Sequence, residues 1–281
     1  MSAGGDRLAH GTLAKLKSSP ESPVAYAMPV GDTTVALNAL LGERLTLRFE
    51  GAIYCVACRR KTNKSFNQGY CYPCFRSLAA CDTCIMSPER CHFREGTCRE
   101  PEWGLAHCMT DHVVYLANGT GLKVGITRAG QVPTRWIDQG AVQALPFART
   151  STRQQAGFLE VALKAHVSDR THWQQLLKGN PEPIDLLAAR AQLLERCAPE
   201  IERLRERFGI QAVVPATDAD VWQFDYPVRA FPAKVRSLAL EKLGVVEGEL
   251  VGIKGQYLIL SSGVINVRKY TGHEVELLAA G

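Results

Sequence analysis

The sequence predicts an α+β protein with a cysteine-rich N-terminal region, a small central α/β domain and a C-terminal small antiparallel β-barrel or meander. Three observations lead to this class. Eight of the ten cysteines fall between Cys55 and Cys98, apolar and polar residues alternate in short runs before and after the middle of the chain, and helical spacing begins only after residue 130. A chain of 281 residues is long enough for two or three small domains.

We expect five segments along the chain. Residues 1–23 are polar and read as a mobile tail, and 24–110 contain a β-strand that leads into two cysteine-rich metal sites. Residues 111–182 form the central domain, 183–212 are helical, and 213–281 form the C-terminal β meander.

Local patterns justify the elements in order. The segment LTLRFEGAIY alternates like a half-buried strand and runs into Cys55. HVVYLA and LKVGIT flank the turn NGTG and predict a hairpin. Ser151 or Thr152 can cap the helix that follows. Beyond residue 247, four short alternating runs separated by glycine-containing turns predict the meander.

Composition bounds the location and the charge. No apolar run approaches the roughly 20 residues that cross a bilayer, and the N-terminus lacks the apolar stretch of a secretion signal. We therefore expect a cytoplasmic protein that does not contact a membrane. Cytosolic thiols stay reduced, so ten cysteines favour metal sites over disulfides. Two zinc ions with four thiolates each would lower the formal net charge of +5 to about +1, so any surface for polyanions is a local patch.

The first four cysteines have the spacing of a zinc ribbon. Cys55, Cys58, Cys71 and Cys74 form two CxxC pairs separated by twelve residues. Each CxxC turn directs two sulfurs at one point, and the intervening residues can make a hairpin that joins the pairs. This spacing predicts a structural zinc site, with disulfides or a redox dithiol as the alternatives.

A second metal site is predicted from the later cysteines. The pair Cys81 and Cys84 supplies half of the site and Cys91 and Cys98 most simply supply the other half, with Cys108, His92 or His107 as alternatives for Cys91 or Cys98. Zinc is the expected metal, and an iron–sulfur cluster, which also needs four thiolates, is the alternative. Protein ligands can fill every position of both sites, so we expect both metals to be structural.

Basic and aromatic residues alternate through this region. Arg59 and Arg60 lie between the first two CxxC pairs, among aromatic residues such as Tyr54, Phe66 and Tyr70. Basic groups beside exposed aromatics suit phosphate contact with base stacking, which predicts DNA or RNA as the partner. The aromatics could equally fill small cores beneath the metal sites.

The run HVVYLANGTGLKVGITR, followed by Arg135 and by Glu160 on a helix, resembles the GIY-YIG nuclease domain, in the variant whose second motif reads K-[IV]-G-x-T. The resemblance covers roughly residues 112–173 and rests on order and spacing. It implies that two strands bring an early tyrosine beside the second motif, that an arginine contacts phosphate and that a glutamate holds one divalent metal ion.

Carried over by position, the resemblance implies that Tyr115 assists proton transfer, Arg135 grips phosphate and Glu160 holds Mg²⁺ or Mn²⁺. Lys123 and Gly125 match the second motif, and Lys123 could supply a further polar role. Such a carboxylate and arginine suit phosphodiester cleavage. We expect Trp136, Gln139, Arg149 and Arg153 to line the substrate pocket.

The match has departures. Val124 stands where the family often has a second tyrosine, and Thr171, His172 and Trp173 stand where many members have an asparagine, the nearest being Asn180. The alternative is therefore a non-catalytic module with a degenerate nuclease fold that binds nucleic acid or protein. The whole chain also resembles members of an uncharacterised bacterial family that join a cysteine-rich region, this central unit and a GIKGQYLI tail.

Overall fold

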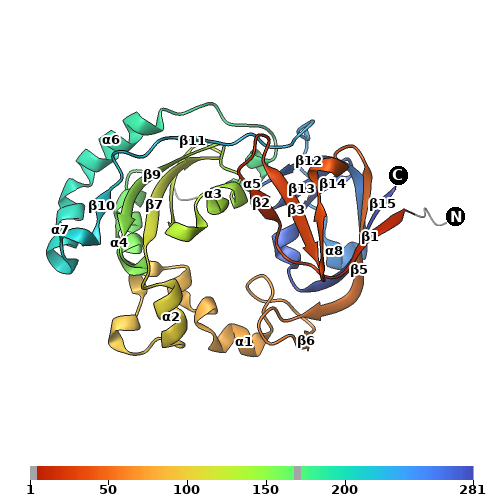
Figure 1. Cartoon of the computed structure of the whole chain (residues 1–281), viewed down its shortest axis with the longest axis horizontal. Helices are drawn as coiled ribbons and strands as arrows, with labels where there is room; N and C mark the ends of the chain where they lie inside the picture. Colours follow the sequence, from red (N-terminus) through yellow and green to blue (C-terminus); the bar gives the residue numbers. More distant parts are fainter. Residues whose placement is uncertain (1–4, 168–171, 281) are drawn as a thin grey trace.

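A computed structural model describes residues 5–167 and 172–280, and in that part of the chain the strands form three sheets (Figure 1). The largest sheet has seven strands in the order β1-β15-β5-β12-β13-β14, with β6 paired to β5. All of its pairings are antiparallel. The strands are β1 (Asp6–Thr12), β5 (Arg44–Tyr54), β6 (Lys61–Thr62), β12 (Val245–Lys254), β13 (Tyr257–Leu260), β14 (Gly263–Asn266) and β15 (His273–Ala280).

This sheet contains both ends of the chain. β1 pairs with β15 from Asp6 to Thr12, and the side chains of Leu13 and Leu16 just after it are fully buried. The prediction of a mobile tail over residues 1–23 is therefore wrong for residues 5–23, and residues 1–4 lie outside the described part. The prediction failed because the pairing partner of this polar segment is a strand at the far end of the chain, which no local pattern reveals.

The C-terminal residues form a meander as expected, but not a separate unit. After β14 the chain returns as β15, which lies between β1 and β5. Within the described residues no barrel closes, because the strand order runs from β1 at one edge to β14 at the other. The mixed helices and antiparallel sheets agree with the α+β class.

The central sheet has five strands in the order β10-β9-β7-β8, with β11 also paired to β9. The predicted hairpin is confirmed as β7 and β8. The strands are β7 (His112–Asn118), β8 (Leu122–Arg128), β9 (Gln143–Thr150), β10 (Val214–Pro215) and β11 (Trp222–Gln223).

Every residue of β7 is buried because both faces of the central sheet are covered. Val114 and Leu116 join a core made with the helices on one face, whereas Val113, Tyr115 and Ala117 join a core shared with the large sheet. This follows from the two-residue period of a strand. The helices that border these faces are α3 (Thr134–Asp138), α4 (Arg153–Lys164), α5 (Trp173–Leu176), α6 (Leu186–Arg196) and α7 (Ala198–Phe208).

The cysteine-rich segment consists of loops and short helices and lies below the two larger sheets in Figure 1, where it is drawn in orange. It follows β5 and β6 and ends at β7, so it connects the large sheet to the central sheet. Its helices are α1 (Tyr72–Ser77), α2 (Pro101–His107) and the 3-10 turns η2 (Ala79–Cys81), η3 (Thr83–Ile85), η4 (Pro88–Arg90) and η5 (Phe93–Glu95).

The remaining elements are short. In a third sheet, β3 pairs with β2 on one side and β4 on the other. No helix in the described part of the chain combines the length and apolar character of a transmembrane span. The elements are β2 (Lys17–Ser19), β3 (Ala25–Val30), β4 (Thr33–Ala36), α8 (Leu240–Leu243), η1 (Asn38–Leu40), η6 (Ala129–Gln131), η7 (Ile210–Ala212) and η8 (Val267–Tyr270).

Candidate metal centres and a cationic cavity

The first four cysteines meet at one point. The sulfurs of Cys55, Cys58, Cys71 and Cys74 all lie within 4.8 Å of one another. Cys55 follows β5, and the N–H of Arg59 donates to its carbonyl over 2.9 Å, with Arg59 in the left-handed conformation (φ 61°). This tight turn presents the first pair, and the start of α1 presents the second. Four converging thiols can hold a metal ion such as zinc.

The pKa values of two of these thiols are shifted in opposite directions. Burial raises the pKa of Cys55, but hydrogen bonds from the backbone N–H groups of Cys58 and Cys71 outweigh burial and lower the pKa to about 6. Burial and hydrogen bonds with the other thiols raise the pKa of Cys74 to about 12. The Cys55 thiolate therefore forms easily while Cys74 keeps its proton, and a bound dication would favour the thiolate form of its ligands.

The later cysteines are not grouped as the simplest predicted ligand set would require. Cys84, Cys91, Cys98 and Cys108 line one small cavity of about 10 Å³. Cys81 is not among its lining residues, and its sulfur lies 3.7 Å from the side-chain nitrogen of Asn67.

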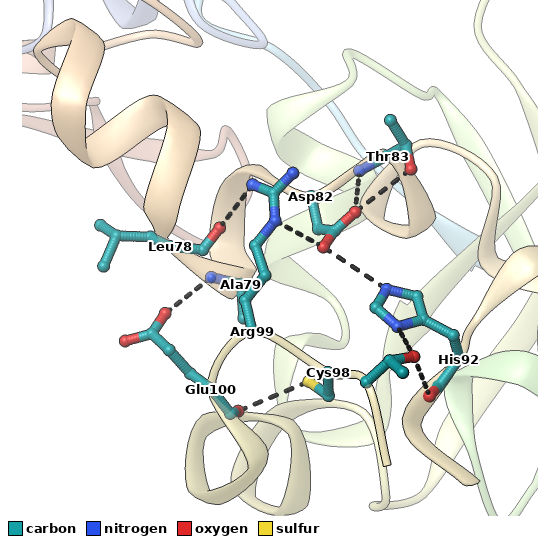
Figure 2. A network of polar contacts seen from close by, with 9 residues as sticks. Leu78, Ala79, Asp82, Thr83, His92, Cys98, Arg99 and Glu100 are labelled. Atoms are coloured by element: carbon teal, nitrogen blue, oxygen red, sulfur yellow. Dashed lines mark hydrogen bonds and ion pairs between the residues drawn. The ribbon is translucent and has the colours of Figure 1, made fainter. Parts of the chain in front are cut away.

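Asp82 organises the polar side of this second cluster (Figure 2). One of its carboxylate oxygens accepts from the N–H of Thr83 at 2.6 Å, and the other lies 2.8 Å from Arg99 Nε and 3.5 Å from His92 Nε2. Burial opposes the charge of Asp82, but the Thr83 hydrogen bonds and the Arg99 charge lower its pKa. Asp82, Cys84 and His92 offer ligand atoms within 4.8 Å of one another, so they are a rival metal group.

The loop of the second cluster contacts the start of α4 through hydrogen bonds. Thr152 caps this helix through a capping box with Gln155, which confirms the predicted start. The side chain of Gln154 donates to the Cys91 carbonyl over 2.7 Å, and Arg153 Nη2 donates to the Ile85 carbonyl over 2.7 Å. The loop before Cys91 therefore docks on the first turn of α4.

Two residues of the predicted catalytic set, Tyr115 and Lys123, form a hydrogen-bonded group with Gln139, which was predicted to line the substrate pocket. The Tyr115 hydroxyl donates to Gln139 Oε1 over 2.8 Å, and Lys123 Nζ donates to the same oxygen over 3.1 Å. Tyr115 is fully buried and Lys123 is 4 % exposed. Gly125 lies opposite Tyr115, and a Cβ there would lie 2.7 Å from the phenol oxygen, so the glycine makes room for the tyrosine.

Arg135 and Glu160 lie around this group. Burial raises the pKa of Tyr115 to about 12 against the lowering effect of the Arg135 charge, and the Glu160 charge adds to the increase. Burial and the charge of Arg135 lower the pKa of Lys123 to about 8. Glu160 forms an ion pair with Lys164 at 3.2 Å. Of the four predicted catalytic groups, Tyr115 and Lys123 are enclosed by protein and share Gln139 as a hydrogen-bond partner, whereas Arg135 lines a cavity and Glu160 is paired with Lys164.

An open cavity of about 650 Å³ lies between the cysteine-rich segment, the central sheet and the large sheet. Residues from all of these parts line it, and in the described part of the chain none of the lining residues is acidic. Its basic lining residues are Lys15, Arg128, Arg135, Arg153 and Arg268, and His107 also reaches it.

Besides burial, the positive charge of Arg135 lowers the pKa values of two other arginines that line this cavity. Burial lowers the pKa of Arg153 and of Arg268, and the nearby charge of Arg135 lowers both further. Lys15 is paired with Asp138 at 2.8 Å. Of the predicted residues, Arg153 from the substrate set and Arg135 from the catalytic set line the cavity. The predictions missed Lys15, Arg128 and Arg268 because they come from three distant segments.

Other predicted substrate residues lie elsewhere. Arg59, Arg60 and Arg149 are exposed and do not line the cavity. Trp136 is fully buried and its ring contacts Tyr115, Trp222 and Phe224, so it belongs to the core and the prediction that it lines the substrate pocket is wrong.

Two of the residues at or near the position of the asparagine found in many GIY-YIG nucleases contact residues of the C-terminal strands. Asn180 accepts from Lys254 Nζ over 2.8 Å, and Trp173 stacks on Tyr257. Thr171 lies outside the described residues.

A family model described as "Protein of unknown function (DUF2797)" matches residues 42–275, and the chain belongs to this family. No curated protein and no solved structure matches the chain. The family match covers the cysteine-rich region, the central sheet and most of the C-terminal meander. The resemblance to GIY-YIG nucleases gains nothing from these comparisons and stays a prediction.

Proposed function

We propose that this family member is a zinc-containing protein that binds nucleic acid in the cationic cavity and, through its GIY-YIG-like central domain, hydrolyses phosphodiester bonds with Mg²⁺ or Mn²⁺. One observation carries the proposal: a cavity of about 650 Å³ has five basic and no acidic lining residues among those described, and one of them, Arg135, is near enough to Tyr115 and Lys123 for its charge to affect both.

The cavity favours a phosphate-bearing ligand because its charges repel one another. Arg135 lowers the pKa of Lys123, Arg153 and Arg268 through its charge, in addition to their burial. A phosphate between these side chains relieves the repulsion, and guanidinium groups bind phosphate oxygens in pairs. A cavity of this size accommodates part of a strand, so nucleic acid, with charge spread along a backbone, fits better than a small anion.

The roles of the buried residues follow from their pKa values. Because the pKa of Tyr115 is raised to about 12, its phenol keeps its proton at neutral pH and acts as a hydrogen-bond donor. Lys123, with a pKa lowered to about 8, is the group that exchanges a proton near neutral pH. Arg135, which lines the cavity, contacts the phosphate.

Glu160 offers one carboxylate for a divalent ion. No group of three acidic, histidine or cysteine ligands includes it among the described residues. We propose that Mg²⁺ or Mn²⁺ would bind there through this one carboxylate, water and phosphate oxygens of the substrate, as such ions often do. A bound ion of this kind would stabilise negative charge on the phosphate. Lys164 holds the Glu160 carboxylate in place meanwhile.

The test compares matched arginines. Fluorescently labelled single- and double-stranded DNA and RNA are incubated with purified protein and Mg²⁺, and cleavage and anisotropy are recorded. We expect cleavage to be lost in Glu160→Gln with zinc content unchanged, and binding to be lost in Arg135→Ala. Arg149→Ala removes an exposed arginine outside the cavity and should change neither. Cleavage by Glu160→Gln at the wild-type rate removes the proposed metal ligand.

A non-catalytic binding module is the second candidate. The observation that favours it is the burial of Tyr115 and Lys123, neither of which lines the cavity. Binding that falls steeply with salt, is weakened by Arg135→Ala and is never followed by cleavage would support this candidate over the nuclease.

A further inference from the structure

We propose that the second metal site consists of Cys84, Cys91, Cys98 and Cys108 around a single zinc-type ion, and that Cys81 is not a ligand. This ion ties the cysteine-rich segment to the first turn of α4 and to the start of β7. The assignment concerns metal binding alone and does not depend on the proposed nuclease activity.

The four cysteines line one enclosure. Cys84, Cys91, Cys98 and Cys108 all line the cavity of about 10 Å³. Each of them therefore faces the same small space as the other three.

Cys81 lies apart from this group. Its sulfur lies 3.7 Å from Asn67 Nδ2, a residue of the loop between the first two cysteine pairs. The CxxC unit of Cys81 and Cys84 thus spans two environments, because Asp82 between them begins the turn η3.

The rival ligands have other bonds. Asp82 uses one oxygen for Thr83 and the other for Arg99, as Figure 2 shows. Nδ1 of His92 lies 2.7 Å from the Thr97 hydroxyl and its Nε2 faces Asp82. Nδ1 of His107 lies 2.9 Å from the Trp103 carbonyl, on the turn before it. A metal at these residues would have to break the network that shapes the loop, whereas the thiols need only lose protons.

The size of the cavity decides between one ion and an iron–sulfur cluster. Gly104 of α2 packs against the site so closely that a Cβ there would lie 2.9 Å from the Phe93 ring and 3.3 Å from the Cys98 sulfur. The enclosure has room for about one small ion. An iron–sulfur cluster brings several irons with their own sulfides and needs a wider opening, whereas tetrahedral zinc with four thiolates draws the sulfurs together.

The site also connects to the cationic cavity. The backbone N–H of Arg153 donates to the Cys108 carbonyl over 2.8 Å, and both residues line the larger cavity. Gln154 donates to the Cys91 carbonyl. An ion that fixes Cys91 and Cys108 therefore fixes the two carbonyls on which the start of α4 rests, and with them the position of Arg153.

The test is a matched pair of buried cysteines. Cys108 is 7 % exposed and Cys81 is 9 % exposed, so both substitutions by serine disturb the core to a similar degree. Full-length proteins are purified under reducing conditions and their metals are measured by mass spectrometry. We expect two zinc ions per chain in the wild type and in Cys81→Ser, and one in Cys108→Ser. One ion in Cys81→Ser with two in Cys108→Ser overturns the assignment.

A second measurement uses only the wild type, so it does not depend on whether the variants fold. Wild-type protein is loaded with ¹¹³Cd, and correlations between cadmium and cysteine β-protons identify the ligands directly. We expect one cadmium correlated with Cys84, Cys91, Cys98 and Cys108, and the other with the first site. A correlation from Cys81, or from a histidine, contradicts the ligand set. Iron with acid-labile sulfide in the freshly purified wild type contradicts the single ion.

Discussion

Lys123 provides a quantitative test because its charge is buried at a cost that depends on pH. The side chain is 4 % exposed, and burial together with the Arg135 charge lowers its pKa from 10.5 to about 8. The unfolded chain keeps the ordinary value, so between these two pH values the unfolded state binds more protons. Stability therefore rises with pH across this window, from about 8 to 10.5, and the cost is fully present below it.

The magnitude follows from the shift. One pKa unit corresponds to about 1.4 kcal/mol, so the free energy of unfolding of the wild type should rise by about 3 kcal/mol relative to Lys123→Met between pH 7 and pH 10.5. Methionine keeps the length of the side chain and cannot titrate. When the free energy of unfolding of one protein is subtracted from that of the other, the contributions of the titrating groups that they share cancel.

Urea unfolding followed by tryptophan fluorescence, at constant free zinc, measures this difference. Lys254→Met is the matched control, because burial also lowers the pKa of Lys254 to about 8 but its Nζ lies on the Gly179 carbonyl, away from the cationic cavity. Both variants should show the same pH dependence, and only Lys123→Met should weaken oligonucleotide binding at pH 7. If the free energies of unfolding of wild type and Lys123→Met differ by the same amount at every pH, the inference that a charged Lys123 is buried at a cost is refuted.

Three further predictions concern the motif, the cavity and the metals. Gly125→Ala should lower the free energy of unfolding by about 1–3 kcal/mol, because the new Cβ would lie 2.7 Å from the Tyr115 phenol; a urea midpoint equal to wild type contradicts this. Arg268→Ala should weaken oligonucleotide binding and reduce the slope of log affinity against log salt by about 1, whereas Arg149→Ala leaves the slope unchanged, as anisotropy titrations at several salt concentrations will show. Removing the metals with a chelator should speed amide hydrogen exchange throughout residues 55–108 and leave β12–β15 protected; uniform protection would mean that the loops do not need metal.

Several features were predictable from the sequence because their causes are local. The four sulfurs of the first metal site come from two tight turns within twenty residues, so spacing alone predicted their convergence. The β7–β8 hairpin and the capping box that begins α4 also depend on adjacent residues. In these cases hydrogen bonds and turn geometry select the structure before any distant contact forms.

Distant pairings could not be predicted in this way. The strand β1 lies against β15 from the other end of the chain, so a segment that reads as a polar tail becomes part of the large sheet. Trp136 follows the predicted phosphate ligand in sequence but faces the core, because the large sheet covers that side of the central sheet. Burial of a helix or strand face is decided by what packs on it, which adjacent residues do not specify.

The sequence by itself determined that four thiols of the cysteine-rich segment converge and which hairpin forms the central strands. Only the tertiary structure decided which thiols share the second enclosure, since Cys81 and Cys84 face different neighbours although they are three residues apart. It also decided that arginines from separate segments face one cavity. The physical reason is that local geometry fixes turns, whereas the convergence of side chains from distant segments requires the packed sheets that bring those segments together.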